Sequence, residues 1–189
     1  MSLFINFDEL DSELFLLQQL VLASEGYCLQ EMIGNEKLDV GDGKFDIYWS
    51  WIKGIVSESL IDCAIKTRIF QDYLSESENL IMEIDLSKAD FEARKDLNIG
   101  IIHEGNFELT LRESCNKIIH AKKSVPSWNE KTVADMTFKY WNGSFHLYGS
   151  KGNRNWHLEL RVGDWAKAMS IYHDILESSE GRNYVGQDW

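Results

Sequence analysis

The sequence has few of the features that mark secreted, membrane-spanning or zinc-stabilised proteins. Its 189 residues include only three cysteines, Cys28, Cys63 and Cys115, with no CxxC pair and no Cys/His cluster. Each lies at an apolar position of a predicted helix, so we interpret all three as reduced core residues. No apolar run approaches the ~20 residues that span a membrane, and the short stretch 4–7 is no signal peptide. We therefore expect a soluble, cytoplasmic protein with no membrane partner.

Basic residues are scarce. The chain has 19 Lys and Arg against 31 Asp and Glu, which gives a net charge of −12. This balance disfavours a general nucleic-acid binder, because binding to phosphates depends largely on Lys and Arg. One local group of cations remains: Arg112, Lys117, Lys122 and Lys123. The three lysines are candidate RNA-binding residues, and the alternative is the solvated basic end of a helix.

Familiar catalytic motifs are also absent: there is no Gly-rich phosphate loop, GxSxG elbow, HExxH pair or kinase signature. Three histidines raise the question of a metal. His146 and His157 are predicted on one polar sheet face, where they could meet, and His173 lies in a predicted helix. No convincing third ligand accompanies the pair, so we predict no metal site and no cofactor. His103 could add an imidazole to another site, but a single loop histidine is more often a surface residue.

The chain does contain a well-marked helical pattern at residues 106–123. Its apolar residues recur at the spacing of a buried helical face: Leu111, Cys115, Ile118 and Ile119. Beside this face Arg112, Asn116 and His120 are four residues apart, so they form a ladder along one side of the helix. Asn106 is predicted to cap the first turn, and Pro126 to end the element.

The string Leu-Arg-x-x-x-Asn-x-x-x-His-Ala at residues 111–121 resembles the signature helix of HEPN domains. These are all-helical modules of prokaryotic toxins, defence systems and RNA-processing factors. The usual catalytic pattern has four to six residues between Arg and His. This chain has seven, with Asn at the middle, which resembles a recognised variant of the motif.

The resemblance implies a metal-independent endoribonuclease, in a toxin–antitoxin or defence context, that forms a homodimer with two motif helices adjacent. His120 would handle the proton of the ribose 2′-hydroxyl or of the leaving oxygen. Arg112 would stabilise charge on the phosphorane oxygens, and Asn116 would orient one of them. The alternative is a non-catalytic HEPN-like interaction or regulatory module that binds a protein partner such as an antitoxin. In that case the ladder only stabilises a helix pair.

A buried guanidinium needs a carboxylate partner. Glu58 and Asp62, on the long helix predicted at 45–76, are the candidate supporting residues for Arg112. Their alternative interpretation is an exposed charge ladder with Lys66, four residues after Asp62.

After Pro126 the apolar period changes from 3.6 to 2. Asn142 and Gly143 predict a two-residue turn, which would place Tyr140 opposite Phe145. The same register would place Phe138 opposite Leu147, so that one face of the hairpin is wholly apolar. A third strand is predicted at 156–162, which completes a three-stranded antiparallel meander.

The predicted fold is therefore mostly α (α+β): a HEPN-like helical bundle with an appended β-meander and a C-terminal helix. Helices are expected at 6–26, 45–76, 106–123 and 163–178, with a short helix at 87–97. The helical domain would span 1–126, and the meander with the last helix, packed on it as one compact unit, would span 127–178. Residues 179–189 would be a flexible tail.

Overall fold

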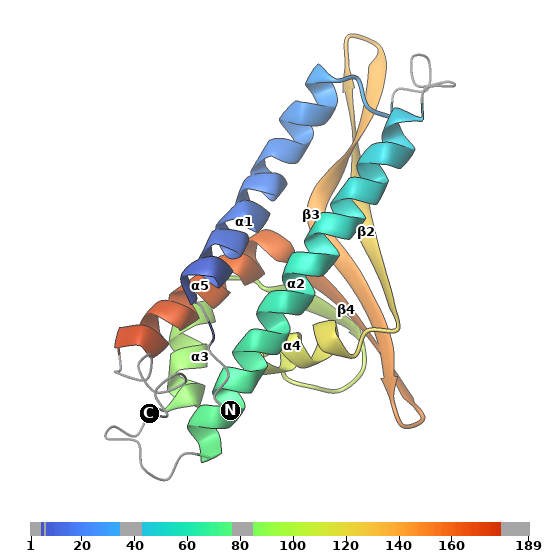
Figure 1. Cartoon of the computed structure of the whole chain (residues 1–189). Helices are drawn as coiled ribbons and strands as arrows, with labels where there is room; N and C mark the ends of the chain where they lie inside the picture. Colours follow the sequence, from blue (N-terminus) through green and yellow to red (C-terminus); the bar gives the residue numbers. More distant parts are fainter. Residues whose placement is uncertain (1–4, 6, 35–42, 77–84, 179–189) are drawn as a thin grey trace.

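The computed structural model describes residue 5 and residues 7–34, 43–76 and 85–178. Within these ranges the chain forms helices and one antiparallel sheet (Figure 1). In chain order the elements are α1 (Phe7–Gln30), α2 (Lys44–Glu76), α3 (Leu86–Arg94), β1 (Gly100–Glu104), α4 (Leu111–Ile119), β2 (Lys123–Val133), β3 (Met136–Lys151), β4 (Arg154–Arg161) and α5 (Val162–Ser178). The predicted tail at 179–189 lies outside the described residues.

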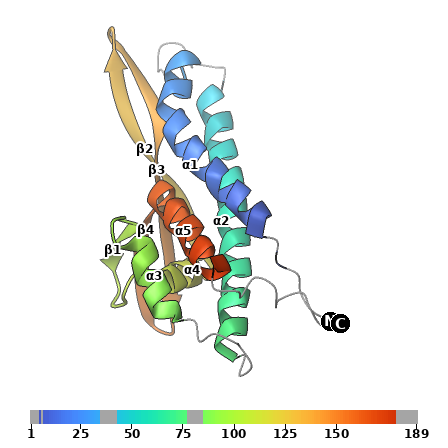
Figure 2. The ribbon, with the colours of Figure 1, turned by 90° about the vertical axis from the view of Figure 1, so that its left-hand side faces the viewer.

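The helices predicted at 6–26, 45–76 and 163–178 are confirmed as α1, α2 and α5, and the short helix predicted at 87–97 corresponds to α3. Their periodic apolar residues pack inward; Leu10, Leu14 and Leu17 of α1, for example, are fully buried. Figure 2 shows the sheet at one side of the molecule, α2 at the other, and α5 between them. None of the described helices is long and apolar enough to span a membrane.

The predicted three-stranded meander is wrong, because the sheet has four antiparallel strands in the order β1-β4-β3-β2. β1 is only five residues long, which is too short to show the apolar–polar alternation that marks a strand in a sequence. β2 begins at Lys123, within the predicted helix. Pro126 lies inside β2, next to a register shift between Pro126 and Trp128, an irregular position where a residue without an N–H is tolerated.

The predicted hairpin register is also wrong. β3 continues without interruption through Asn142 and Gly143. The β2–β3 turn lies instead at Ala134 and Asp135, whose φ angles of 50° and 64° place both in the left-handed region. Phe138 consequently pairs with a residue of β2 and not with Leu147.

Gly143 serves a different purpose from the predicted turn. Its φ is +85°, and a Cβ at this position would lie 2.7 Å from Cγ1 of Val21 on α1. The glycine therefore allows α1 to approach the backbone of β3 closely. The Asn-Gly pair marks a contact between a helix and a strand.

The central helix α4 begins later than predicted. Thr110 is its N-cap, with Oγ1 accepting the N–H of Glu113 at 3.0 Å, so the predicted cap at Asn106 is wrong. The buried carboxylate of Asp90 on α3 accepts the N–H of Leu111 at 2.7 Å. Two acceptors therefore satisfy backbone donors at the first turn of the helix.

The helix also ends earlier than predicted. His120 is its C-cap, and the N–H of Lys122 already donates to the carbonyl of Tyr148 on β3. Strand pairing, and not the proline, terminates the helix. The predicted apolar face is confirmed, since Leu111, Cys115 and Ile118 are buried.

One continuous core joins the helices to the sheet. The cluster of buried apolar residues includes side chains from α1, α2, α4, α5 and the strands β3 and β4. Trp141, Trp165 and Tyr172 are its largest fully buried members. The segments 1–126 and 127–178 thus contribute to the same core, and β1 of the first segment pairs with β4 of the second.

Candidate functional site

The ladder residue Arg112 lies at the first turn of α4 and reaches across to α2. Its guanidinium donates to Asp72 Oδ1 at 2.6 Å and to Gln71 Oε1 at 3.5 Å. The side chain is 44% exposed, so this ion pair is partly screened by solvent. It holds the start of α4 against the C-terminal part of α2.

The predicted supporting residues do not contact Arg112, which is a correction to their assignment. Asp62 forms an ion pair with Lys66 at 2.5 Å, and Glu58 is exposed. The reason is the position at which the helices meet: α4 packs near the C-terminal end of α2, where Asp72 is located. The alternative of a solvated charge ladder on α2 fits Asp62 and Lys66.

Asn116, the middle ladder residue, donates a hydrogen bond to the carboxylate of Glu113. Its Nδ2 donates to Glu113 Oε2 at 3.0 Å, while Lys117 Nζ pairs with Glu113 Oε1, also at 3.0 Å. Burial alone would raise the pKa of the Glu113 carboxyl, but donation from Asn116 and Lys117 outweighs it and lowers the pKa below its usual value. The carboxylate is therefore ionised at neutral pH.

Lys117 is buried, which corrects its assignment as an RNA-contacting cation. Its side chain is 9% exposed, and Nζ lies 4.0 Å from the ring centroid of Phe107 and 4.7 Å from that of Trp156. With Glu113 as counter-ion, the ammonium forms a cation–π clamp between the helix and the sheet. Lys117 therefore stabilises the packing of α4 against the sheet.

His120 opens into a pocket of about 460 Å³ between the end of α4 and the β3–β4 hairpin. Asn116, Lys122, Ser150 and Lys151 line the same pocket. Lys122 is exposed, and its Nζ lies 2.6 Å from Ser150 Oγ. The sequence ladder thus places an exposed imidazole and an amide beside two lysines.

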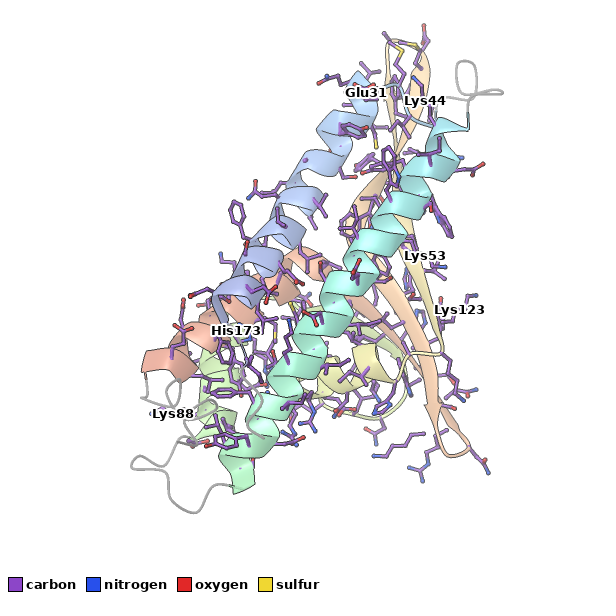
Figure 3. All side chains as sticks on the ribbon, viewed as in Figure 1. Glu31, Lys44, Lys53, Lys88, Lys123 and His173 are labelled. Atoms are coloured by element: carbon purple, nitrogen blue, oxygen red, sulfur yellow. The ribbon has the colours of Figure 1, made fainter. Side chains whose placement is uncertain are left out.

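Arg112 lines a different pocket, of about 370 Å³, together with Asp90, Arg94 and Glu108. The ladder is therefore split: Asn116 and His120 share one hollow, and Arg112 belongs to another. Lys123, the third predicted RNA-binding lysine, lies on β2 with Nζ 5.4 Å from the ring centroid of Tyr148 (Figure 3). It does not line the His120 pocket.

A second polar cluster lies on the half-exposed face of the sheet. His103 on β1, His146 on β3 and His157 on β4 have ligand nitrogens that all lie within 4.8 Å of one another. His146 Nδ1 is 3.0 Å from His157 Nε2, and Glu159 Oε2 is 2.9 Å from His103 Nε2. The predicted meeting of His146 and His157 is confirmed. His103, which we expected to be an isolated surface residue, is exposed but adds a third imidazole to the pair.

The surroundings of this cluster lower the pKa of two of its groups, His157 and Glu159. Burial, together with the positive charges that His103 and His146 can carry, lowers the pKa of His157. The hydrogen bond with His103 lowers the pKa of the Glu159 carboxyl. A neutral imidazole therefore lies near a carboxylate at neutral pH.

His173 does not join the cluster. It is fully buried on α5, with Nε2 3.0 Å from Thr67 Oγ1 on α2 and Nδ1 2.9 Å from Asp11 Oδ1 on α1 (Figure 3). The order carboxylate–imidazole–hydroxyl is that of a nucleophilic triad, but Thr67 is also fully buried and inaccessible to a substrate. This arrangement links three helices.

The three cysteines are free and buried, as predicted. Burial raises the pKa of Cys28 to about 11 and that of Cys115 to about 12, and it raises the pKa of Cys63 as well. Thiols in this state are poor nucleophiles, so a catalytic cysteine is not supported.

Comparisons of the chain with protein-family models, with curated proteins and with solved structures found no match. The geometry of the site is therefore what indicates a function. Sequence patterns could not identify the roles of three residues: Asp72 beside Arg112, His103 in the histidine cluster and Lys151 in the His120 pocket. Each has its role through a contact between elements that are distant in the chain.

Proposed function

We propose that this protein is an endoribonuclease that cleaves RNA without a metal ion, with His120 as the proton-transferring group. The observation that carries the proposal is the pocket that joins His120 and Asn116 to Lys122 and Lys151 in a chain of net charge −12. An acidic protein that binds a phosphodiester requires locally concentrated positive charge. The pocket supplies it beside an exposed imidazole.

A neighbouring pocket of about 400 Å³ extends this positive region. It shares Glu113, Lys117 and Lys151 with the His120 pocket and adds Arg154 of β4. Because Glu113 pairs with Lys117, the net positive charge comes from Lys151 and Arg154. A strand of RNA could therefore follow the hairpin end of the sheet, with its backbone neutralised by Lys122, Lys151 and Arg154.

The chemistry assigned to these residues follows from their types. His120 removes the proton from a ribose 2′-hydroxyl, whose oxygen attacks the adjacent phosphorus while the bond to the 5′-oxygen of the next nucleotide breaks. Lys122 and Lys151 stabilise the charge on the phosphorane oxygens, and Asn116 donates a hydrogen bond to one of them. The leaving 5′-oxygen takes a proton from water and the protonated His120 returns its proton to solvent, so the products are a 2′,3′-cyclic phosphate and a 5′-hydroxyl.

Arg112 enters this scheme through a second copy of the chain. Because Arg112 and His120 line different pockets of one chain, the resemblance to HEPN domains implies that paired α4 helices combine the two groups. A homodimer with adjacent α4 helices stays a prediction of this proposal.

The decisive experiment is cleavage of total cellular RNA by the purified full chain in EDTA. We expect His120→Ala to reduce the rate by about 10²–10⁴-fold while leaving thermal unfolding unchanged. Lys151→Ala should weaken RNA binding and reduce its salt dependence, whereas Lys88→Ala, an exposed lysine on α3, should do neither.

His146→Ala is the matched histidine control, because it lies outside the pocket and should retain cleavage in EDTA. Unchanged cleavage by His120→Ala would assign the activity to another site. Absence of cleavage by the wild type across varied RNAs would contradict the proposal.

A second candidate function, a non-catalytic interaction module, is favoured by one surface of α2. Six apolar side chains on this helix are 40–56% exposed: Ile47, Trp51, Ile55, Ile61, Ile65 and Ile69. Their spacing confines them to an arc of about 120° on the helix. Such an apolar stripe is typical of a protein interface, and a second copy of this chain, which carries the same stripe, is the partner that we propose.

A further inference from the structure

Three histidines that are distant in sequence, His103, His146 and His157, meet on the half-exposed face of the sheet. We propose that they form a binding site for a late first-row divalent cation, with Zn²⁺ as the expected ion. The site is separate from the His120 pocket and does not depend on the ribonuclease proposal.

The distances fit a shared ion. The ligand atoms of the three imidazoles all lie within 4.8 Å of one another, and Nδ1 of His146 is 3.0 Å from Nε2 of His157. Tetrahedral zinc with Zn–N bonds of about 2.0–2.1 Å requires nitrogens about 3.3–3.4 Å apart. The 3.0 Å separation and the 4.8 Å upper limit bracket this spacing, so binding requires side-chain rotations that adjust the distances between the nitrogens.

The backbone of the sheet fixes where the three histidines lie. In the register of β3 and β4, His146 is opposite Glu159 and Tyr148 is opposite His157, so the two histidines are diagonal neighbours. On β1 the register shifts between Ile102 and Glu104, which makes His103 the extra residue of a bulge. Bulges re-aim side chains, and they are frequent next to functional sites.

Neighbouring groups hold the imidazole rings in place. The ring of His157 stacks between those of Tyr148, at 4.2 Å between centroids, and His103, at 4.5 Å. Glu159 Oε2 lies 2.9 Å from Nε2 of His103 and supplies a negative charge beside the cluster. A carboxylate that orients a metal-binding histidine is a common feature of metal sites.

The donor set selects the class of ion. Imidazole nitrogens suit zinc, copper, nickel and cobalt, whereas magnesium and calcium prefer oxygen ligands. Three protein ligands on a half-exposed face leave at least one coordination position for water. The competing interpretation is a stacked, hydrogen-bonded histidine cluster that binds no ion.

The test is titration of the chelator-treated full chain with ZnCl₂, followed by isothermal calorimetry. We expect one equivalent to bind the wild type and His120→Ala, whose histidine lies in another pocket. His103→Ala and His157→Ala should each lower the affinity by about 100-fold or more, and Glu159→Gln by about 10–100-fold. Substitution with Co²⁺ should give the visible absorption of a tetrahedral site in the wild type and in His120→Ala, but not in His103→Ala or His157→Ala.

His103 is 40% exposed, so His103→Ala should fold normally, as circular dichroism can verify. Absence of stoichiometric Zn²⁺ binding to the wild type would overturn the proposal. Equal Zn²⁺ affinity of wild type and His103→Ala would overturn it too, because the ion would then be bound elsewhere.

Discussion

Glu113 shows how one residue connects the stability of α4 to the candidate pocket. It accepts a hydrogen bond from Asn116 and an ion pair from Lys117, and it lines the same pocket as His120. The carboxylate therefore positions two neighbours of the imidazole. A substitution of Glu113 should therefore lower folding stability, and under the proposed function it should also reduce cleavage.

The lowered pKa of Glu113 gives this stabilisation a defined pH dependence. Because the folded-state pKa lies below the ordinary value of 4.5, the contribution is complete above that pH and is lost as the pH falls through the folded pKa. At pH 7 we expect Glu113→Gln to lower the free energy of unfolding by about 1 kcal/mol. Urea unfolding of both proteins from neutral pH downward measures this difference, which should vanish in acid.

Glu130→Gln is the control, since Glu130 is an exposed carboxylate on β2 that lies 3.5 Å from Lys139. Its unfolding free energy should follow that of the wild type within about 0.5 kcal/mol. A constant difference between wild type and Glu113→Gln down to the acid range would contradict the assigned pKa shift.

Among the elements, β3 is the clearest case in which a local sequence signal gave the wrong structure. Asn142 and Gly143 form a strong turn signal, but the strand continues through them because α1 packs on Gly143 through Val21. The true turn, Ala134 and Asp135, has no glycine to mark its positive φ angles. A contact between distant elements thus overrode a local preference.

Two glycines allow this contact to be tested. We expect Gly143→Ala to lower the free energy of unfolding by about 1–3 kcal/mol, since the methyl group would contact Val21 in a backbone region that alanine disfavours. Gly54→Ala on α2 has nothing within 4 Å of the added Cβ and should stabilise the protein by about 0.5–1 kcal/mol. Thermal unfolding measures both, and a stable Gly143→Ala protein would argue against the close approach of α1.

Local periodicity also decided which helices and site residues were predictable from the sequence. The long helices α1, α2 and α5 were predictable because their apolar period repeats over many turns. His146 and His157 were predictable as a pair because strand alternation puts them on one face. His103 was not, because β1 is short and only its bulge aims the ring at that face. Asp72 was not, because the crossing point of α2 and α4 is a tertiary property.

At the scale of the whole molecule, the apolar stripe of α2 predicts self-association. No described element lies in front of α2 in Figure 1, and Figure 2 shows α2 on the side away from the sheet. We expect light scattering to show a dimer at tens of micromolar, because burial of six apolar side chains against a second copy removes a large apolar area from water. Ile55→Ser combined with Ile65→Ser should give a monomer.

Leu22→Ser is the matched control, because Leu22 is 75% exposed but lies on α1. A dimer that survives the double substitution but dissociates in Arg112→Ala would favour the α4 contact expected from the ribonuclease proposal. A wild-type monomer at these concentrations would count against both dimers.

The hydrogen bonds of His173 have a consequence for the order of events during synthesis. Asp11 and His173 are 162 residues apart, yet their side chains meet in the finished core, and α1 packs extensively against α5. At a translation rate of about 5–20 residues per second, α1 waits roughly 8–32 s for its partner to leave the ribosome. Throughout that interval Phe7 of α1 lacks the His173 ring that packs against it at 5.0 Å between centroids. The nascent chain therefore exposes its first helix for longer than any other, and this is where a chaperone would be expected to bind.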